Sequence, residues 1–201
     1  MRFGQVAVKD AKFRTFIADA AARREFYQHV YDVTYGLVRP GKDTLVVLDD
    51  SIVRGNTMKN AILPMLDRLG PRRIIVASSA PPICYPDCYG IDMSTLDELV
   101  AFRALVNLER VRGLKATDDM RELYACHSQQ ELSNEIARLI TPAGMRAQVD
   151  VVFQTIQDLH ACCPDSAGDW YFTGNYPTPG GEQVLHEALK NYLAHRNERS
   201  Y

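Results

Sequence analysis

The clearest pattern along the chain is a short apolar run that ends in two acidic residues. Residues 44–50 read Thr-Leu-Val-Val-Leu-Asp-Asp, which is typical of a parallel strand buried on both faces. Apolar side chains in residues 57–69 recur at the spacing of one helical face, and a Gly-Pro pair ends that helix. A second apolar run at 73–78 predicts the next strand. Together these elements predict a parallel crossover, so the chain is expected to be an α/β protein.

Further helices are indicated by their capping signals. Pro64 lies inside the first helix and predicts a kink, because proline donates no backbone hydrogen bond. The patterns Thr-x-x-Glu at 95–98 and Ser-x-x-Glu at 128–131 resemble capping boxes. Thr-Pro opens a predicted helix over 141–159, in which apolar residues follow a 4-3-4-3 spacing. A last helix is expected at about 182–195, so the C-terminal part is predicted to be a helical extension.

Composition narrows the class of protein. The chain has 201 residues, of which 46% are hydrophobic and 24% are charged, the balance of a folded globular protein. Its formal net charge of −2 does not favour nucleic acid as a partner. No apolar run approaches the ~20 residues that span a bilayer, and no signal peptide is recognisable, so no membrane partner is expected. Five cysteines, two of them adjacent at 162–163, indicate a reducing compartment, and the protein is expected to be cytoplasmic.

The loop after the first strand holds the candidate ligand site. Asp49 and Asp50 end the strand at the carboxyl edge of the predicted sheet, where α/β proteins bind ligands. Their carboxylates can accept hydrogen bonds from sugar hydroxyls or hold Mg²⁺. The turn that follows leads into a helix N-terminus and offers groups suited to a phosphate: Ser51, Arg54, Gly55, Asn56 and Thr57. The spacing alone is equally consistent with an ordinary turn and helix cap.

The residues of this loop resemble a known motif. Residues 46–57 are similar to the motif that binds phosphoribosyl pyrophosphate (PRPP) in type I phosphoribosyltransferases. Their Asp-Asp-Ser-Ile-Val-Arg-Gly resembles in particular the amidophosphoribosyltransferases, also called glutamine PRPP amidotransferases. Other segments resemble that family in the same order along the chain: 14–17, 78–93 followed by Glu98-Leu99, and 172–178. The resemblance implies a partial type I phosphoribosyltransferase core with a parallel sheet.

The resemblance also implies a glycosyl transfer, the first committed step of purine biosynthesis. Ammonia from glutamine attacks C1 of PRPP, pyrophosphate leaves, and 5-phosphoribosylamine forms. By motif position, Asp49 and Asp50 hold the ribose hydroxyls and Mg²⁺. The 5-phosphate is held by Ser51, Arg54, Gly55, Asn56 and Thr57. Lys12 and Arg14 lie in the segment that resembles the catalytic loop of the family. Mg²⁺ and basic groups then neutralise the departing pyrophosphate.

The chain also departs from the family. The glutaminase domain, the first strand of the transferase sheet and the pyrophosphate loop have no counterpart before Arg14. We therefore expect the chain to be the back part of such an enzyme, with a glutaminase domain or chain as its partner. The catalytic-loop segment at 9–17 is shorter than that of the family, and Asn56 stands where threonine is usual. Whether the chain is active by itself is left open.

Some members of the family hold an iron–sulfur cluster through cysteines. The matching positions in this chain are Asp87, Gly168 and Tyr171, and the nearby Cys88 and Cys162–Cys163 are displaced from them. No cluster is therefore expected, and Mg²⁺ is the cofactor that the resemblance implies. The aromatic residues that follow Gly168 are expected to pack onto the protein rather than to stack against a base.

Several alternatives stay open at the level of the sequence. We expect a phosphoribosyltransferase core over residues 1–112 and a helical extension over residues 113–201. A PRPP-binding regulatory or inactive module and a nucleobase phosphoribosyltransferase are the alternative functions. By resemblance, a homo-oligomer is expected, and purine nucleotides are candidate feedback inhibitors.

Overall fold

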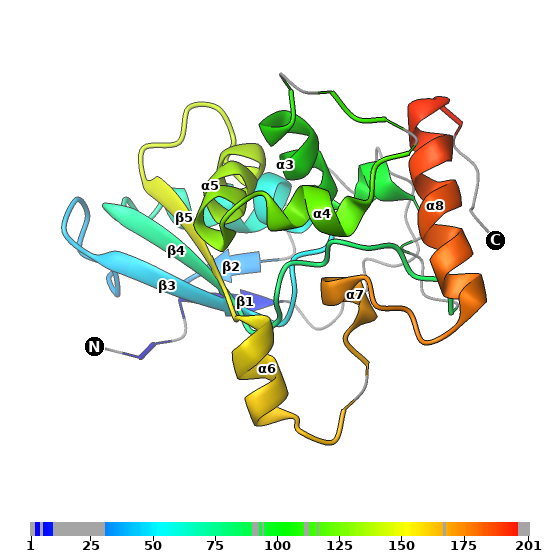
Figure 1. Cartoon of the computed structure of the whole chain (residues 1–201). Coiled ribbons are helices and arrows are strands. Elements are labelled where there is room, and N and C mark those ends of the chain that lie inside the picture. The colour runs from blue at the N-terminus through cyan, green and yellow to red at the C-terminus, as the bar shows by residue number, and fades with distance from the viewer. Residues whose placement is uncertain are drawn as a thin grey trace. The chain divides into compact units, whose positions relative to one another are not determined.

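The structure is a computed structural model (Figure 1), and it describes residues 3–4, 6–9, 31–89, 93, 95–110, 113–115, 117–166 and 168–196. The strands are β1 (Ala7–Lys9), β2 (Tyr31–Val33), β3 (Thr44–Asp49), β4 (Arg73–Ser78) and β5 (Gln148–Phe153). The helices and helical turns are η2 (Met58–Ile62), α2 (Leu63–Asp67), η3 (Leu96–Glu98), α3 (Val100–Leu108), α4 (Met120–Ala125), α5 (Gln129–Ile140), α6 (Ile156–Cys162), α7 (Trp170–Thr173) and α8 (Pro179–Leu193). Within these ranges, every helix is too short or too polar to span a membrane.

Contacts within the chain divide it into two compact units. The first comprises residues 1–47, 55–76 and 140–150, and the second comprises residues 48–54, 77–139 and 151–201. The strands β3, β4 and β5 each begin in the first unit and end in the second. From the sequence, a boundary between a phosphoribosyltransferase core and a helical extension is expected at residue 112. That boundary stays a prediction.

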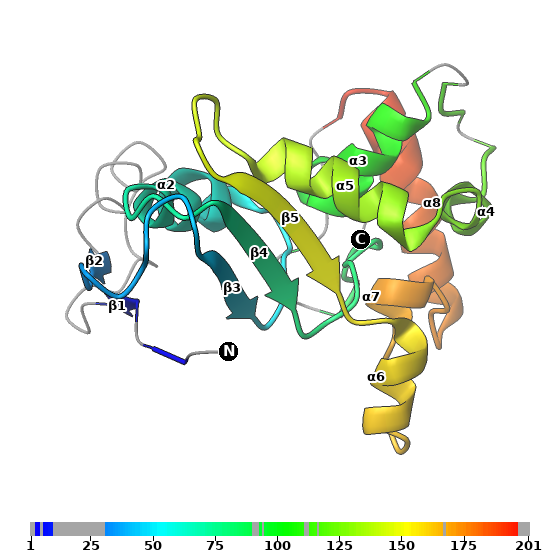
Figure 2. The same cartoon turned by 90° about the vertical axis from the view of Figure 1, so that its left-hand side faces the viewer.

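A parallel sheet with the order β3-β4-β5 is the main feature of the structure (Figure 2). Just before β4 the Arg72 amide donates to the Asp43 carbonyl, and just after β4 the Ser79 amide donates to the Asp49 carbonyl, each at 2.9 Å. The two bonds advance in the same direction along both segments, as parallel strands require. The strands β1 and β2 form a separate antiparallel pair. The predicted α/β class and the predicted parallel strands are therefore confirmed.

The prediction that β3 is buried on both faces is wrong. Leu48 is 76% exposed and Val46 is 54% exposed, whereas Ile74 and Val76 on β4 are completely buried. The order of the described strands explains this difference, because β4 has a neighbour on each side and β3 is an edge strand. An apolar run predicts a strand but does not indicate its position in the sheet.

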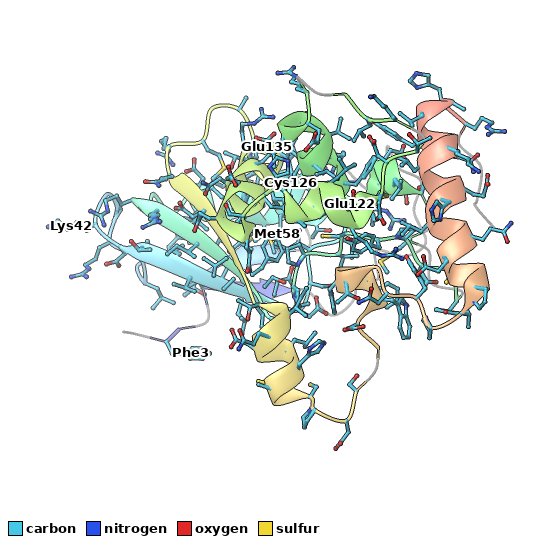
Figure 3. The ribbon with its side chains drawn as sticks, viewed as in Figure 1. Phe3, Lys42, Met58, Glu122, Cys126 and Glu135 are labelled. Atoms are coloured by element: carbon cyan, nitrogen blue, oxygen red, sulfur yellow. The ribbon has the colours of Figure 1, made fainter. Side chains whose placement is uncertain are left out.

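The helix predicted at 57–69 is present, but its hydrogen bonding changes midway. The Leu63 amide donates to the carbonyl of Met58, five residues back, which is a π-helical bond. Pro64 follows directly and has no amide hydrogen, so a regular ladder cannot run through this point. The side chain of Met58, labelled in Figure 3, is buried like those of Met65 and Leu66. The helical face predicted from the sequence thus forms core of the first unit.

The helix predicted over 141–159 is wrong, because Gln148–Phe153 form the strand β5. Val151 and Phe153 are buried, and Val152 between them is 54% exposed, which is the alternation of a strand. Over so short a stretch, the same apolar residues fit a period of two as well as a helical period. Pairing with β4 decides between the two, and β-branched residues favour that choice. A helix begins only after the strand, as α6.

The two predicted capping boxes have different outcomes. The Ser128 amide donates to the Glu131 carboxylate at 2.8 Å, and the Glu131 amide donates to the Ser128 hydroxyl oxygen at 3.2 Å, so the box that opens α5 is confirmed. The prediction at 95–98 is wrong, because Thr95 makes no side-chain cap bond and only a 3-10 turn follows it. Glu98 instead accepts a hydrogen bond from Arg54 at 2.6 Å. The pattern at this position therefore marks a tertiary contact.

The helices α3, α5 and α8 contribute completely or almost completely buried side chains to the core of the second unit. Phe102 on α3 and Ile136 on α5 are completely buried, and Leu189 on α8 is 2% exposed. The ring of Phe102 meets that of Tyr192 edge to face, with 4.8 Å between the ring centroids. Helix α8, whose N-cap is Thr178, agrees with the last helix predicted from the sequence.

Candidate functional site

Two adjacent carboxylates stand where β3 ends, Asp49 as its last residue and Asp50 as the first residue of the loop that follows. Asp49 is partly buried and Asp50 is exposed. The Asp49 Oδ1 accepts from the Asp50 amide at 3.1 Å, and the Asp50 Oδ1 accepts from the Ser51 amide at 2.6 Å. Burial raises the pKa of Asp49, the Asp50 amide opposes this rise, and the Asp50 carboxylate adds to it. A cation or a hydroxyl donor would offset the cost of the ionised form, so the pair is suited to Mg²⁺ or to sugar hydroxyls.

The start of this loop is fixed by the residues that follow β4. The Ser79 amide donates to the Asp49 carbonyl at 2.9 Å, and the Ala80 amide donates to the Asp50 carbonyl at 3.0 Å. The Ser79 hydroxyl donates to the same two carbonyls at 3.3 and 3.2 Å. Ser79 belongs to the segment 78–93 that resembles the amidophosphoribosyltransferases. Two of the resembling segments therefore meet at the carboxyl ends of β3 and β4.

The side chain of Arg54, which was expected at a phosphate, is bound to Glu98. Its Nε and Nη2 donate to the Glu98 Oε2 at 3.0 and 2.6 Å. The Arg54 carbonyl accepts from the Arg103 Nη2 at 2.6 Å, and the Val53 carbonyl accepts from the Val100 amide at 2.8 Å. The sequence placed Glu98 in a resembling segment but gave no sign of these contacts. A phosphate contact of Arg54 stays a prediction.

The end of the loop turns at Gly55. Its φ of 72° lies in the left-handed region, which favours glycine. The Gly55 carbonyl accepts from the Lys59 amide at 2.9 Å where the helix begins. The side chains of Asn56 and Thr57 are exposed at this point. The turn therefore presents short polar groups, while phosphate binding by Ser51, Gly55, Asn56 and Thr57 stays a prediction.

The expected catalytic residues, Lys12 and Arg14, lie outside the described residues. Of the segment at 9–17 that resembles the catalytic loop, only Lys9 at the end of β1 is described. The roles of Lys12 and Arg14 therefore stay predictions.

Two positions that match cluster ligands of the family hold a hydrogen-bonded pair. The Tyr171 hydroxyl donates to the Asp87 Oδ1 at 2.6 Å, and the Tyr89 amide donates to the Oδ2 at 3.0 Å. Asp87 is completely buried. Burial, assisted by the bond to Asp87, raises the pKa of Tyr171 to about 12, so the phenol keeps its proton at neutral pH. Among the described residues, no group of metal-ligating side chains is found, and the expected absence of a cluster stays a prediction.

The segment that contains Asp87 is fastened to the segment that contains Tyr171. The Tyr171 carbonyl accepts from the amides of Cys84 and Tyr85 at 2.9 and 3.1 Å. The Tyr176 hydroxyl donates to a backbone carbonyl of the first segment, that of Pro86. The expectation that the aromatic residues pack onto the protein is confirmed. The contact thus joins two resembling segments that are far apart in the sequence.

Arg121 on α4 binds the same region and was missed by the sequence reasoning. Arg121 directly precedes Glu122 in the sequence, and the label of Glu122 in Figure 3 locates this part of α4. Its Nη2 donates to the Gly174 carbonyl at 2.8 Å and to the Glu182 Oε1 at 2.6 Å. Gly174 has a φ of 75° and ends α7, and an added Cβ would lie 2.9 Å from the ring of Tyr85. No motif surrounds Arg121, so no signal in the sequence could have indicated this contact.

Comparisons with known proteins agree with these observations. No family model matches the chain. The amidophosphoribosyltransferase of Staphylococcus epidermidis is 32% identical over 186 residues, which are 92% of this chain and 31% of that protein. This chain is related to the amidophosphoribosyltransferases. The amidophosphoribosyltransferase of Haemophilus influenzae is 41% identical over 96 residues, which are 46% of this chain and 18% of that protein. The chain thus spans less than a third of the length of these relatives.

Solved structures show the same relationship. The glutamine PRPP amidotransferase from Bacillus subtilis, complexed with ADP and GMP, has a TM-score of 0.50 at 28% identity, over 86% of this chain and 32% of that chain. A structure described as the allosteric regulatory enzyme of purine biosynthesis has a TM-score of 0.51 at 30% identity, over 86% of this chain and 31% of that chain. The chain corresponds to the phosphoribosyltransferase part of amidophosphoribosyltransferases. The resemblance inferred from the sequence is therefore confirmed.

Proposed function

We propose that the chain is the PRPP-binding part of an amidophosphoribosyltransferase. In this reaction ammonia from glutamine attacks C1 of PRPP, pyrophosphate leaves, and 5-phosphoribosylamine forms, which begins purine biosynthesis. The observation that carries the proposal is the loop at 49–57, where two adjacent carboxylates and a glycine turn stand at the end of a parallel strand. Similarity over 92% of the chain to an amidophosphoribosyltransferase supports it.

In this proposal Asp49 and Asp50 accept hydrogen bonds from the ribose hydroxyls and hold Mg²⁺. Their oxygens are the ligands that Mg²⁺ prefers, and the raised pKa of Asp49 indicates that a cation beside it would be stabilising. The bound ion would supply positive charge to the departing pyrophosphate. The exposed Asn56 and Thr57, with Ser51, Arg54 and Gly55, bind the 5-phosphate.

The rest of the reaction needs groups beyond this loop. Lys12 and Arg14 are proposed to contribute positive charge near the pyrophosphate. A glutaminase domain or chain, which is the proposed partner, would supply the ammonia. A relative of known structure is complexed with ADP and GMP, and we propose purine nucleotides as feedback ligands of the complete protein, which we expect to be a cytoplasmic homo-oligomer.

The first experiment is a calorimetric titration of the full chain with Mg²⁺ and PRPP. It compares the wild type with the double variant Asp49→Asn/Asp50→Asn. Loss of two carboxylates that bind ligand is expected to weaken binding at least tenfold, which corresponds to ~1.4 kcal/mol. The control is Glu122→Gln/Asp165→Asn, which removes the same charge from exposed positions and should leave binding unchanged.

The possible results separate the candidate functions. Binding that is lost only in the Asp49→Asn/Asp50→Asn variant supports a PRPP loop, and pyrophosphate release on addition of ammonium then supports the transferase. Binding without release, even with the partner domain present, would point to a regulatory or inactive module. Release that requires a nucleobase would point to a nucleobase phosphoribosyltransferase. No binding by the folded wild type would contradict the proposal for this chain.

A further inference from the structure

We propose that Glu98 and Arg103 are positioning residues for the PRPP loop, defined as residues 49–57. They hold the turn at Val53 and Arg54 in the shape in which the loop receives the sugar phosphate. This inference rests on the proposed function, because that function identifies the ligand of the loop. It adds two residues outside the loop to those that determine how well the ligand is bound.

The first contact caps a helix. Helix α3 begins at Val100, and its N-cap residue Leu99 has no side-chain group that can accept from the first amides. The Val53 carbonyl takes this role, because it accepts from the Val100 amide at 2.8 Å. The preceding residue, Ile52, is only 3% exposed and anchors the same turn. The position of Val53 in the loop is therefore coupled to the start of α3.

The second contact comes from one turn further along α3. The Arg103 Nη2 donates to the Arg54 carbonyl at 2.6 Å. Burial lowers the pKa of Arg103, and its Nε is buried with no hydrogen-bond partner in the described part of the chain. Burying a guanidinium in this way costs free energy. The bond to the Arg54 carbonyl offsets part of this cost, and it holds the backbone of the loop against α3.

The third contact orients the side chain of Arg54. Its Nε and Nη2 donate to the same oxygen of Glu98, which orients the guanidinium toward that residue. The side chain of Arg54 is 36% exposed and that of Glu98 is 43% exposed. An exposed ion pair of this kind adds little to the free energy of unfolding. Its effect is therefore expected in the orientation of Arg54 and in ligand affinity, with little change in overall stability.

The test uses the full chain and the variant Glu98→Ala. Glu98→Gln, which keeps a hydrogen-bond acceptor, serves as the conservative variant and should restore part of the effect. The matched control is Glu187→Ala, because Glu187 on α8 also forms a partly exposed ion pair, with Lys190, and its side chain is 38% exposed. Three quantities are measured for each: the denaturation midpoint, the hydrogen exchange rate of the Val100 amide, and the dissociation constant for PRPP with Mg²⁺.

Glu98→Ala is expected to leave the midpoint unchanged, to speed exchange of the Val100 amide, and to weaken PRPP binding about tenfold, or ~1.4 kcal/mol. Glu187→Ala is expected to change neither exchange at Val100 nor affinity. Arg103→Gln is expected to weaken PRPP binding as well. Because Arg103 is partly buried, the denaturation midpoint of this variant is measured to check that it is folded.

Two failures of this test are distinguishable. If the wild type binds PRPP and Glu98→Ala binds it equally well or more tightly, the positioning role is overturned while the proposed function stands. If the folded wild type does not bind PRPP, the proposed function is overturned, and the role of Glu98 and Arg103 in binding falls with it.

Discussion

At the scale of residues, two carboxylic acids in loops have different surroundings and therefore different roles. Asp87 is completely buried, and its oxygens accept from Tyr171 and from the Tyr89 amide. Asp49 is partly buried, stands next to a second carboxylate, and has a raised pKa. A buried carboxyl whose oxygens already accept hydrogen bonds stabilises the fold, whereas a partly exposed pair can exchange water for a ligand. Asp87 is therefore structural, and Asp49 is the ligand candidate.

The structural role of Asp87 predicts the effect of Tyr171→Phe. The substitution removes the phenol that donates at 2.6 Å and leaves a buried oxygen with one donor fewer. We expect the free energy of unfolding to fall by about 1–3 kcal/mol, measured as a lower urea midpoint. Tyr35→Phe is the control, because Tyr35 is 72% exposed and the loss of its hydroxyl should change little. Equal midpoints for the two variants would contradict the role of this bond.

At the scale of elements, the limits of several helices and strands are set by contacts between segments that are distant in the sequence. Helix α7 ends at Gly174, whose left-handed φ of 75° brings its backbone against Tyr85 and presents its carbonyl to Arg121. The strand β5 likewise exists because it pairs with β4, although its apolar residues also fit a helix. The start of α3 depends on the Val53 carbonyl. Each of these elements is completed by a residue distant in the sequence.

Gly174→Ala tests the end of α7. The added Cβ would lie 2.9 Å from the Tyr85 ring, and alanine is strained at this φ, so we expect a loss of about 1–3 kcal/mol in unfolding free energy. Gly180→Ala is the matched control, because nothing lies within 4 Å of its added Cβ and the residue is helical. That control should be neutral or stabilising by about 0.5–1 kcal/mol. A Gly174→Ala protein as stable as the control would refute the close approach.

At the scale of the whole molecule, buried and half-buried tyrosines link stability to alkaline pH. Burial raises the pKa of Tyr85, Tyr124 and Tyr176, and it raises that of Tyr171, with the help of Asp87, to about 12. In the unfolded chain these phenols ionise near pH ~10. The folded state therefore keeps protons that the unfolded state releases. The resulting stability is complete below pH ~10 and is lost as the pH rises toward 12.

This linkage is measured by urea unfolding at a series of alkaline pH values, together with a phenolate absorbance titration. We expect the free energy of unfolding to fall with increasing pH above ~10. In Tyr171→Phe the fall should be shallower, because one of the phenols with a raised pKa is absent. A stability that stays constant up to pH 12 would show that these phenols titrate in the folded chain as they do in the unfolded one.

The residues of this chain by themselves determined the strands at 44–49 and 73–78, the capping box at Ser128, and the loop that begins with Asp49. These features depend on neighbours in the sequence: an apolar run, a cap four residues long, and a glycine turn. The same loop and the segments that resemble a family sufficed to indicate the relationship to the amidophosphoribosyltransferases.

Tertiary structure alone decided the exposed edge of β3, the strand at 148–153, and the pairing of Glu98 with Arg54 in place of a helix cap. It also brought Asp87 to Tyr171 and Arg121 to Gly174. A local pattern cannot specify these contacts, because an apolar period or a charged side chain is compatible with several partners. The choice among them depends on burial and hydrogen bonding between segments that meet only when the chain is folded.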